Sequence, residues 1–387
     1  MSELSDVLVV GGGVVGLCSA LAMAERGHHV TLVDKGPLTV DLSVPDLRVY
    51  AINSASEALL RSLGVWHTLL QSRLSPYQRM YVRDGENGAH IDFDACSIAR
   101  PALGFIIEES VLRAALLGKM ALEPRLHLVP HTEIDKVNCD ADRVHAEAGG
   151  QVLKARLLMV ADGRESPTRE LLNIGSTTWP YHQDALICQV ETEKPHEKTA
   201  AQVFRTHGTL AFLPLPDPHQ RSIVWSSSHS HTEHLLALSD DALGDALTEM
   251  FGDFTGKVRV TSARHRFPLY MRHTEAYSGM RWMLLGDCAH TIHPLAGLGL
   301  NVGLADLNTW LQLLDECPDL AWSARLAGRY QRQRKFAVWQ TILVMEGLKA
   351  LFANPLTAPL RGASLRACNH LLPLKRWFIE HAGGEGL

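Results

Sequence analysis

A glycine-rich turn near the N-terminus leaves few folds open to this chain. Val7–Val10 is an apolar run rich in β-branched residues, typical of a strand buried on both faces. It leads into Gly11-Gly12-Gly13-Val14-Val15-Gly16, which fits G-x-G-x-x-G, the pattern that joins a strand to a helix in dinucleotide-binding folds. Residues 15–26 are mostly good helix formers and Gly27 supplies a stop, so the sequence predicts a strand, a tight turn and a helix.

The spacing of the glycines predicts a structural role for each of them. Gly11 suits the tight turn, Gly13 lets the backbone approach a pyrophosphate, and Gly16 allows the helix to pack closely on the strand. Residues 29–33 form the next expected strand, which ends in Asp34, 18 residues beyond Gly16. A carboxylate there can accept hydrogen bonds from an adenosine ribose. A glycine turn with no ligand is the alternative, but the strand, helix and acidic residue together favour a dinucleotide, either nicotinamide or flavin.

Composition limits the classes of protein to which the chain can belong. The chain has 387 residues, of which 46% are hydrophobic and 20% charged, so it is long enough for two interleaved domains and a tail. Its net charge of −5 argues against nucleic-acid binding. The seven cysteines form no CxxC pair, which points to a reducing cytoplasm and away from zinc or dithiol chemistry. Without a leader pattern or an apolar stretch of roughly 20 residues, we expect a soluble, cytoplasmic protein.

The C-terminal part differs in charge from the rest. From Arg329 onward there are nine Lys/Arg against three Glu, a net charge of +6. Apolar residues recur there at helical spacing, and residues 371–378 read LLPLKRWF; the spaced residues are Val338, Trp339, Ile342, Leu343 and Met345. A basic amphipathic tail of this kind can lie on an anionic membrane surface, such as the inner membrane, or dock a partner. A helix packed on the core with solvated basic residues is the alternative.

Two later strands also end in glycine and aspartate. The apolar run 157–160 precedes Asp162-Gly163, and the run 282–285 precedes Gly286-Asp287. Residues 297–303 miss G-x-G-x-x-G by one place, so only one nucleotide-binding unit is predicted. Pro294 and the glycines after it predict a loop, with a helix from Gly299 onward. The positive end of that helix would suit a negative charge on a reduced or oxygenated isoalloxazine ring.

Together these segments resemble the group A flavoprotein monooxygenases, the aromatic hydroxylases with the para-hydroxybenzoate hydroxylase fold. Within that family the chain is most similar to the ubiquinone-biosynthesis hydroxylases, over roughly residues 5–335. The further segments that carry the resemblance are residues 48–56, 63–66, 104–113, 210–215, 222–226 and 286–297. Leu298 stands where these hydroxylases usually have Gln, Cys288 where Ala is common, and Phe105 where Tyr or His is usual. These departures weaken any assignment to one ring position.

The resemblance implies an α/β fold with a discontinuous domain organisation. A Rossmann-like FAD-binding domain would comprise residues 1–75, 100–180 and 270–330. A β-sheet substrate domain would comprise residues 76–99 and 181–269, followed by a C-terminal helical region at residues 331–387.

The resemblance also implies an activity. The chain would be an FAD-dependent aromatic-ring monooxygenase that hydroxylates a polyprenyl phenol or quinol of ubiquinone biosynthesis through a flavin C4a-hydroperoxide. NAD(P)H or another donor would supply electrons, and molecular oxygen would be the second substrate. A hydroxylase of another small phenolic compound and a non-catalytic flavin-binding subunit of a quinone-biosynthesis complex remain alternatives. The W-x-W-x-I-P signature of flavin-dependent halogenases is absent.

Site residues follow from the same resemblance. His290, His293 and Pro294 are the catalytic candidates, although histidine in such a loop is more often a structural hydrogen-bond partner. We expect no metal at His229-Ser230-His231-Thr232-Glu233-His234, because the segment reads as a polar, serine-rich loop without a matching distant ligand. The expected FAD-binding residues are Gly11, Gly13, Gly16, Asp34, Arg48, Arg113, Asp162, Gly163, Gly286, Asp287, Pro294, Gly297, Leu298, Gly299, Leu300 and Asn301.

Overall fold

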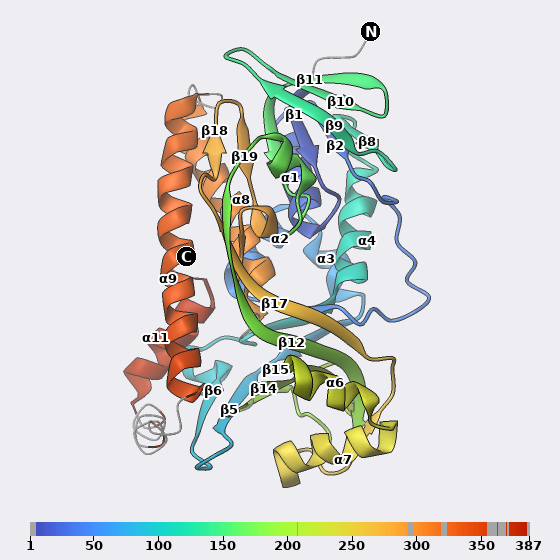
Figure 1. Ribbon diagram of the computed structural model, residues 1–387, viewed down its shortest axis with the longest axis vertical. Helices are drawn as coiled ribbons and strands as arrows, with labels where there is room; N and C mark the ends of the chain where they lie inside the picture. The colour runs from blue at the N-terminus through green and yellow to red at the C-terminus, as the bar shows by residue number, and fades with distance from the viewer. Residues whose placement is uncertain are drawn as a thin grey trace.

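The molecule is a mixed α/β structure built on three sheets, which confirms the predicted fold class (Figure 1). Among the described residues, one sheet has eight strands, one has nine and a small one has three. The computed structural model describes residues 5–206, 208–292, 297–318, 323–353, 362, 369 and 371–384.

The eight-stranded sheet contains the N-terminal strand at its centre. Strand β1 (Ser5–Val10) pairs in parallel with β2 (Val30–Val33) on one side and with β11 (Gln151–Val160) on the other. Both neighbours carry their apolar runs at the same level as β1, so the carboxyl ends of the three strands meet at one edge. The remaining strands are β8 (Leu126–Val129), β9 (Ile134–Cys139), β10 (Val144–Ala148), β18 (Ser278–Gly279) and β19 (Trp282–Leu284).

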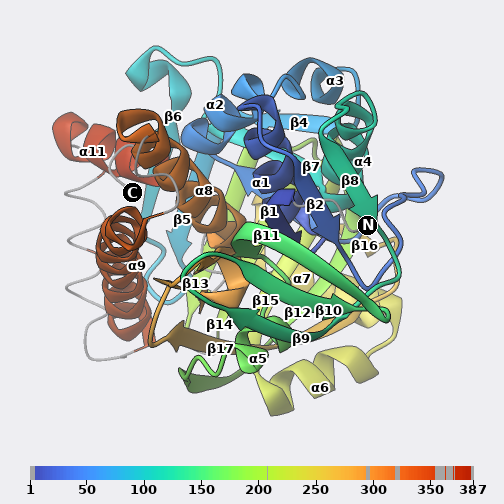
Figure 2. The same ribbon diagram turned by 90° about the horizontal axis from the view of Figure 1, so that it is seen from above.

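Three helices pack around this sheet and close its core. Helix α1 (Val14–Glu25) follows β1 directly and is buried along most of its length, because α4 (Glu109–Met120) and α8 (Gly299–Glu316) lie against it (Figure 2). The predicted helix after the glycine turn and the predicted helix from Gly299 are therefore both present. Short helices adjoin this core, namely α3 (Trp66–Leu70), α5 (Pro167–Leu171) and the 3₁₀ turn η3 (Gly286–Cys288).

The nine-stranded sheet is mostly antiparallel and forms a second core. Its order is β20 (His290–Thr291), β17 (His265–Thr274), β12 (Ser176–Thr192), β15 (Gln220–Ser228), β14 (Gly208–Pro214), β13 (Thr199–Arg205), β5 (Arg79–Asp84) and β6 (His90–Asp94), with β16 (Val258–Val260) on β12. Helices α6 (His229–Ala237) and α7 (Asp240–Phe251) cover one face. The turns η1 (Ala95–Ile98) and η2 (Gly252–Phe254) flank it.

The segment 229–234 belongs to a helix, so the expectation of a polar loop there is wrong. Ser228 caps α6 by accepting a hydrogen bond from the His231 N–H, at 3.4 Å between the heavy atoms. Thr232 and Leu235 point into the core of the sheet. A serine cap followed by two buried residues three apart is a helix signal that outweighs the polar composition.

The third sheet connects the two larger ones. It consists of β3 (Val49–Ile52), β7 (Gly104–Glu108) and β4 (Leu74–Tyr77), and α2 (Ser54–Ser62) follows β3. Strand β12 crosses the predicted domain limit at residue 180, and β17 crosses the limit at residue 270. The domain boundaries themselves stay a prediction.

In the described C-terminal part of the chain, a long helix contacts both large sheets. Helix α9 (Ala324–Ala353) runs along one side of the molecule, with α11 (Leu372–Ala382) near its end (Figure 1). In α9, Val338 and Ile342 are buried, whereas Trp339 and Leu343 are exposed, so the apolar residues noted in the sequence are divided between two faces. No helix in the described ranges combines the length and the hydropathy needed to cross a membrane.

Candidate functional site

The glycine turn has the geometry that its motif predicts. Gly11 adopts φ +112°, and a Cβ there would lie 2.2 Å from the carbonyl oxygen of Ala161 at the end of β11. A Cβ on Gly16 would lie 1.9 Å from the Gly11 carbonyl oxygen, so helix and strand touch there. By contrast, a Cβ on Gly13 would meet no atom within 4 Å. The turn is therefore closed at Gly11 and Gly16 and open at Gly13.

The N-terminus of α1 lies at this open side. Its N-cap residue is Gly13, no side chain caps the helix, and its first turn holds no acidic residue. The first N–H groups of such a helix have no intrahelical acceptor and carry the positive end of the helix dipole. The turn can therefore receive an anion such as a pyrophosphate.

Asp34 and Arg113 both reach the same turn. The Asp34 carboxylate accepts hydrogen bonds from the backbone N–H groups of Gly12, at 2.5 Å, and Gly36, at 2.7 Å. Arg113 of α4 donates from Nε to the carbonyl oxygen of Gly12, at 3.2 Å. Since a carboxylate has about four acceptor positions, Asp34 keeps capacity for ribose hydroxyls.

The middle Asp-Gly motif adjoins the first glycine through β11. Asp162 Oδ2 accepts from the backbone N–H of Thr168, at 3.1 Å, whereas Oδ1 is buried and has no hydrogen-bond partner among the described residues. Burial raises the pKa of Asp162, and hydrogen bonds from Ser166 and Thr168 oppose that shift. Gly163 has φ +85° and open space around it. A buried oxygen without a donor is expected where a ligand completes the contacts.

The late Gly-Asp motif lies across the turn from α1. Gly286 has φ +65°, and a Cβ there would lie 3.4 Å from the Val15 side chain. The neighbouring Asp287 is half-buried. Burial raises the pKa of its carboxyl, and the positive charges of Arg164, His290 and Arg48 oppose the rise. Arg48 and Asp287 are thus near each other although they are far apart in the sequence.

Arg48 also has a partner inside the protein. It forms an ion pair with Glu109, at 3.0 Å, and lies over the Phe267 ring with its Cζ atom 5.8 Å from the centroid. Tyr50 donates to the same Glu109 carboxylate, at 3.0 Å. Burial lowers the pKa of Arg48, but Tyr50 and Glu109 outweigh burial and raise it. The guanidinium is half-exposed, so it keeps N–H groups free of the ion pair.

The start of α8 is fixed on the small sheet by Asn301. Asn301 Nδ2 donates to the carbonyl oxygen of Ala51, at 2.7 Å, and its Oδ1 accepts from the backbone N–H of Asn53, at 3.0 Å. Gly297 has φ +65°, and a Cβ there would lie 3.4 Å from the Ala51 Cβ. The N-cap residue Leu298 offers no side-chain cap to the helix. Gly299 and Leu300 form its first turn and are half-exposed, so its N–H groups can face a ligand.

His290 lies in a buried ionic cluster. Its Nε2 is 2.7 Å from Oδ2 of Asp306 in α8, and Arg334 of α9 donates to Oδ1 of the same carboxylate, at 2.7 Å. The backbone N–H of Gly286 also donates to Asp306, at 2.8 Å. Burial alone would raise the pKa of Asp306, but the charges of His290 and Arg334 lower it. This position favours the structural alternative for His290; His293 and Pro294 lie outside the described residues.

Asp306 and Arg334 are the residues that sequence reasoning missed. Asp306 stands among apolar neighbours in the predicted helix, and an acidic residue on a buried helix face was an available signal. Arg334 is almost completely buried, but nothing in the local sequence distinguishes it from the other basic residues of the tail.

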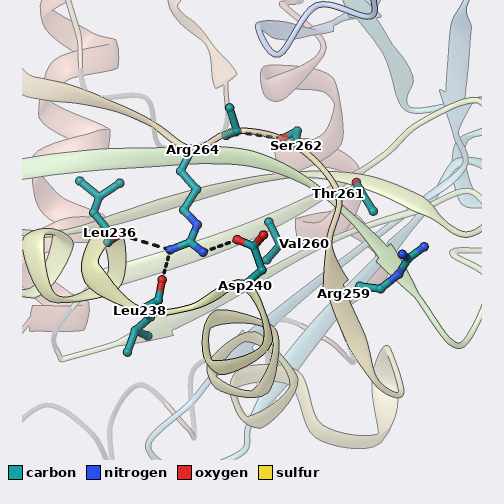
Figure 3. Close-up of a pocket in the computed structure, with 9 residues that line it drawn as sticks. Leu236, Leu238, Asp240, Arg259, Val260, Thr261, Ser262 and Arg264 are labelled. Carbon is teal, nitrogen blue, oxygen red and sulfur yellow. Dashed lines mark hydrogen bonds and ion pairs between the residues drawn. The ribbon is translucent and has the colours of Figure 1, made fainter.

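A surface hollow of about 840 Å³ lies elsewhere, between the end of α6 and strand β16 (Figure 3). Arg264 lies beside it and donates to the carbonyl oxygens of Leu236 and Leu238, at 3.3 and 2.7 Å, and to Asp240. None of the predicted site residues lines it. Its arginine is thus engaged by the end of α6, and the hollow is separate from the glycine turn.

The histidine-rich segment forms no metal centre in the described part of the chain. His229 Nδ1 is 2.8 Å from Asp184 Oδ2, and His231 packs against Trp225 with ring centroids 5.6 Å apart. Within the described ranges, no three metal-binding side chains of His, Cys, Asp or Glu gather into a group that could hold an ion.

Comparison with known proteins identifies relatives over the full chain. Residues 4–343 match the family model described as "FAD binding domain". The 3-demethoxyubiquinol 3-hydroxylase of Escherichia coli is 33% identical, and the match covers 99% of each chain. The ubiquinone hydroxylase UbiL of Rhodospirillum rubrum is also 33% identical, over 99% of this chain and 90% of that one. The p-nitrophenol 4-monooxygenase PnpA of Pseudomonas putida has the same fold, with a TM-score of 0.82 at 18% identity, over 100% of this chain and 99% of that one.

Proposed function

The chain belongs to the FAD-binding monooxygenase family that includes the ubiquinone hydroxylases, and on this basis we propose that it hydroxylates the ring of a polyprenylated phenol or quinol. As a member of this family it is an FAD-dependent enzyme that uses molecular oxygen. The substrate class follows from the relatives' names, a demethoxyubiquinol for one and ubiquinone for the other. The observation that carries the proposal is that three distant motifs meet at two uncapped helix N-termini.

The first of these N-termini would hold the ADP half of FAD. We assign the pyrophosphate to the open side of the turn at Gly13, where backbone N–H groups of α1 have no side-chain cap. Asp34 would bind the adenosine ribose with its remaining acceptor positions, and Arg113 would hold the loop through the Gly12 carbonyl. The cradle fits the group because the turn is open at Gly13, where a side chain would occupy the space, whereas Gly11 and Gly16 are in contact with protein backbone.

The second N-terminus would hold the flavin half. Asp287 would bind ribityl hydroxyls, with Arg48 and Arg164 balancing its charge. Asp162 would gain the donor that its buried Oδ1 lacks. The N–H groups at Gly299 and Leu300 would stabilise negative charge at the flavin ring, since they lie at the positive end of α8. FAD, once bound and reduced by NAD(P)H or another donor, supplies the oxygen activation that an electron-rich ring requires.

The substrate ring would lie on the free face of the nine-stranded sheet. Along β12, β15 and β14, Ile187, Val224 and Ala211 are opposite one another in register and are only half-buried. They alternate with residues that pack under α6 and α7, so they face the other side of the sheet. Gln189 on this side donates to the carbonyl oxygen of Asp46, at 3.1 Å, which places that face toward β3. An apolar face there would orient a prenylated ring and exclude water.

Oxygen uptake by the FAD-loaded protein tests this function. The enzyme would be mixed with NADH or NADPH and a short-chain prenyl phenol, and separately with the same phenol without its prenyl group. We expect oxygen consumption and a hydroxylated product that depend on the prenyl phenol. No oxygen uptake with either phenol, and no product, would identify a flavin-binding subunit that does not turn over. Efficient hydroxylation of the unprenylated phenol alone would support the small-phenol alternative.

We also propose that the enzyme works as a peripheral protein at the inner membrane, where a polyprenylated substrate would partition. The basic C-terminal region supports this location, because anionic lipid attracts positive charge.

A further inference from the structure

One face of α9 carries large apolar side chains that the rest of the described protein leaves exposed. Phe336 is 67% exposed, Leu343 74%, Val344 52% and Trp339 44%. We call these four residues the exposed stripe. Their spacing of three, four and one residues places them on one side of a helix, and Val338 and Ile342 on the opposite side are 0% and 5% exposed. The helix is thus anchored to the protein by one face and presents a second apolar face outward.

Such a stripe is unusual on a protein that carries many charges. Single exposed apolar residues are common, but a contiguous group of aromatic and aliphatic side chains marks an interaction surface. The Trp339 ring packs against the His273 ring, with centroids 4.8 Å apart, so this contact fixes one edge of the exposed stripe. Phe336 and Leu343 each lie about one helical turn from Trp339, on either side of it, and are the most exposed of the four.

The charges beside the stripe are positive. Arg325 and Arg332 are exposed and continue the same helix face toward its N-terminus, and neither forms an ion pair with a described residue. The sequence from Ala324 to Ala353 contains one acidic residue, Glu346. Its carboxylate accepts from the Tyr181 hydroxyl of β12, at 2.5 Å, so it faces the sheet. The outer face of α9 therefore combines arginines with apolar residues in a chain whose net charge is −5.

We propose that the exposed stripe, with Arg325 and Arg332, docks the enzyme on an anionic phospholipid surface. Apolar side chains on one face with cationic neighbours are the features of a helix that lies in the membrane interface. The charges favour anionic lipid as the occupant, because this face is positive although the chain as a whole has a net charge of −5. A second copy of the chain fits less well, because two such faces would bring arginines together with no carboxylate of α9 between them.

The docked orientation gives a route for an apolar substrate. Helix α9 extends along the side of both large sheets, so the stripe brings the whole body to the lipid surface (Figure 1). This consequence rests on the proposed function, whereas docking itself depends only on the stripe and its arginines.

Vesicle flotation with the FAD-loaded protein tests the proposal. The vesicles would contain phosphatidylcholine alone or phosphatidylcholine with phosphatidylglycerol, at low and high salt. We expect binding to the anionic vesicles, and a loss on the order of tenfold in the Phe336→Ser/Leu343→Ser and Arg325→Gln/Arg332→Gln double variants. Leu122→Ser and Arg143→Gln are controls, because both residues are exposed and lie outside α9. Both controls should bind like the unaltered protein.

Two results would overturn docking on lipid. The first is flotation that is absent, or that is the same in the stripe variants and in the controls. The second is a dimer, measured by light scattering, that the Phe336→Ser/Leu343→Ser variant dissociates while no form binds vesicles; the stripe would then be an interface between copies. Oxygen uptake on a water-soluble short-chain phenol, measured in the same variants, separates this outcome from failure of the proposed function. The variants should retain it.

Discussion

Substitutions at Gly13 and Gly16 should have different effects, although both residues belong to one motif. We expect Gly13→Val to fold with a free energy of unfolding within about 1 kcal/mol of the unaltered protein, because its side chain meets only open space. It should lower FAD affinity by at least about tenfold, since the new methyl groups occupy the pyrophosphate position. Gly16→Val should fail to fold, because its Cβ would lie 1.9 Å from a carbonyl oxygen.

Equilibrium dialysis against FAD and thermal unfolding would check this pair. Gly118→Ala in α4 is the control, because a Cβ there meets nothing within 4 Å and lies away from the turn. A Gly13→Val protein that binds FAD normally would show that the pyrophosphate lies elsewhere.

Asp306 is a positioning residue whose charge holds the late motif. Asp306→Asn should destabilise the protein by about 3 kcal/mol or more, because it leaves the buried Arg334 without its carboxylate. The Asp306→Asn/Arg334→Met double variant should recover part of the loss. FAD content should fall in the single variant, because Asp306 also accepts from the Gly286 N–H.

Urea unfolding of the single and double variants measures the coupling. Asp315→Asn is a suitable control, because Asp315 pairs with Arg26 at 2.9 Å on the exposed side of the same helix. If the effects of Asp306→Asn and Arg334→Met simply add, the two charges do not stabilise each other.

The lowered pKa of His273 predicts how the free energy of unfolding changes with pH. Its ring is buried beside Trp339 and Tyr277, and burial lowers its pKa from 6.5 to about 4, with Lys335 and His290 adding to the shift. His273 therefore binds a proton more tightly in the unfolded chain than in the folded protein. Its neutral ring leaves the free energy of unfolding undiminished above pH 6.5, and this free energy falls as the pH drops toward 4. The loss is on the order of 2 kcal/mol.

Urea midpoints between pH 4.5 and 7 in His273→Gln check this dependence. The variant should lose part of the acid sensitivity, whereas His127→Gln, at an exposed histidine of β8, should keep it. Identical pH profiles in all three proteins would remove His273 as the cause.

Among single residues, the sequence best predicted those whose role depends on the local backbone conformation. The tight turn at Gly11 and the close contact of helix and strand at Gly16 follow from local geometry and are present in the fold, and the backbone at Gly13 is open. The position of His290 depends on Asp306 and Arg334, which come from two other elements. Spacing along one strand or loop contains no information on that contact, so the buried cluster could not be predicted.

Among the elements, the junction of α8 and β3 is where we propose that the flavin half of FAD binds. Asn301→Leu keeps a similar volume but removes the hydrogen bonds to Ala51 and Asn53. It should cost about 1–3 kcal/mol of stability, because these backbone groups are left without a partner. FAD should dissociate faster, since the loop at Gly297 is no longer fixed on β3.

Thermal unfolding and stopped-flow release of FAD would measure both effects. Asn138→Leu, in β9, is a control outside this junction. Normal FAD release from Asn301→Leu would show that the junction does not shape the flavin site.

Helices and strands were predicted well where glycines bound an apolar run or a run of helix formers, as in β1, α1 and α8. The segment 229–234 was misjudged because its polar composition was given more weight than the Ser228 cap and the buried Thr232 and Leu235. In α9 the periodicity indicated a helix but not which apolar residues would be covered. Val338 is buried and Leu343 is exposed because of the way α9 packs against the two sheets.

At the scale of the whole molecule, pairing between distant segments builds the site. Parallel pairing of β1 with β2 and β11 brings the glycine turn, Asp34 and Asp162 to one edge of the sheet. Helix α8 then lies against α1 and carries the late loop to the small sheet. The sequence could predict each motif and its ligand, but the free face of the nine-stranded sheet follows only from strand register.

Incorporation of labelled oxygen is the most direct test of the proposed activity. The FAD-loaded enzyme would convert a short-chain prenyl phenol under isotopically labelled O₂, and the product would be analysed by mass spectrometry. We predict one labelled oxygen atom on the aromatic ring, dependent on NADH or NADPH and lost in Gly13→Val. Oxygen uptake that yields only hydrogen peroxide, with an unchanged phenol, would contradict ring hydroxylation of this substrate class.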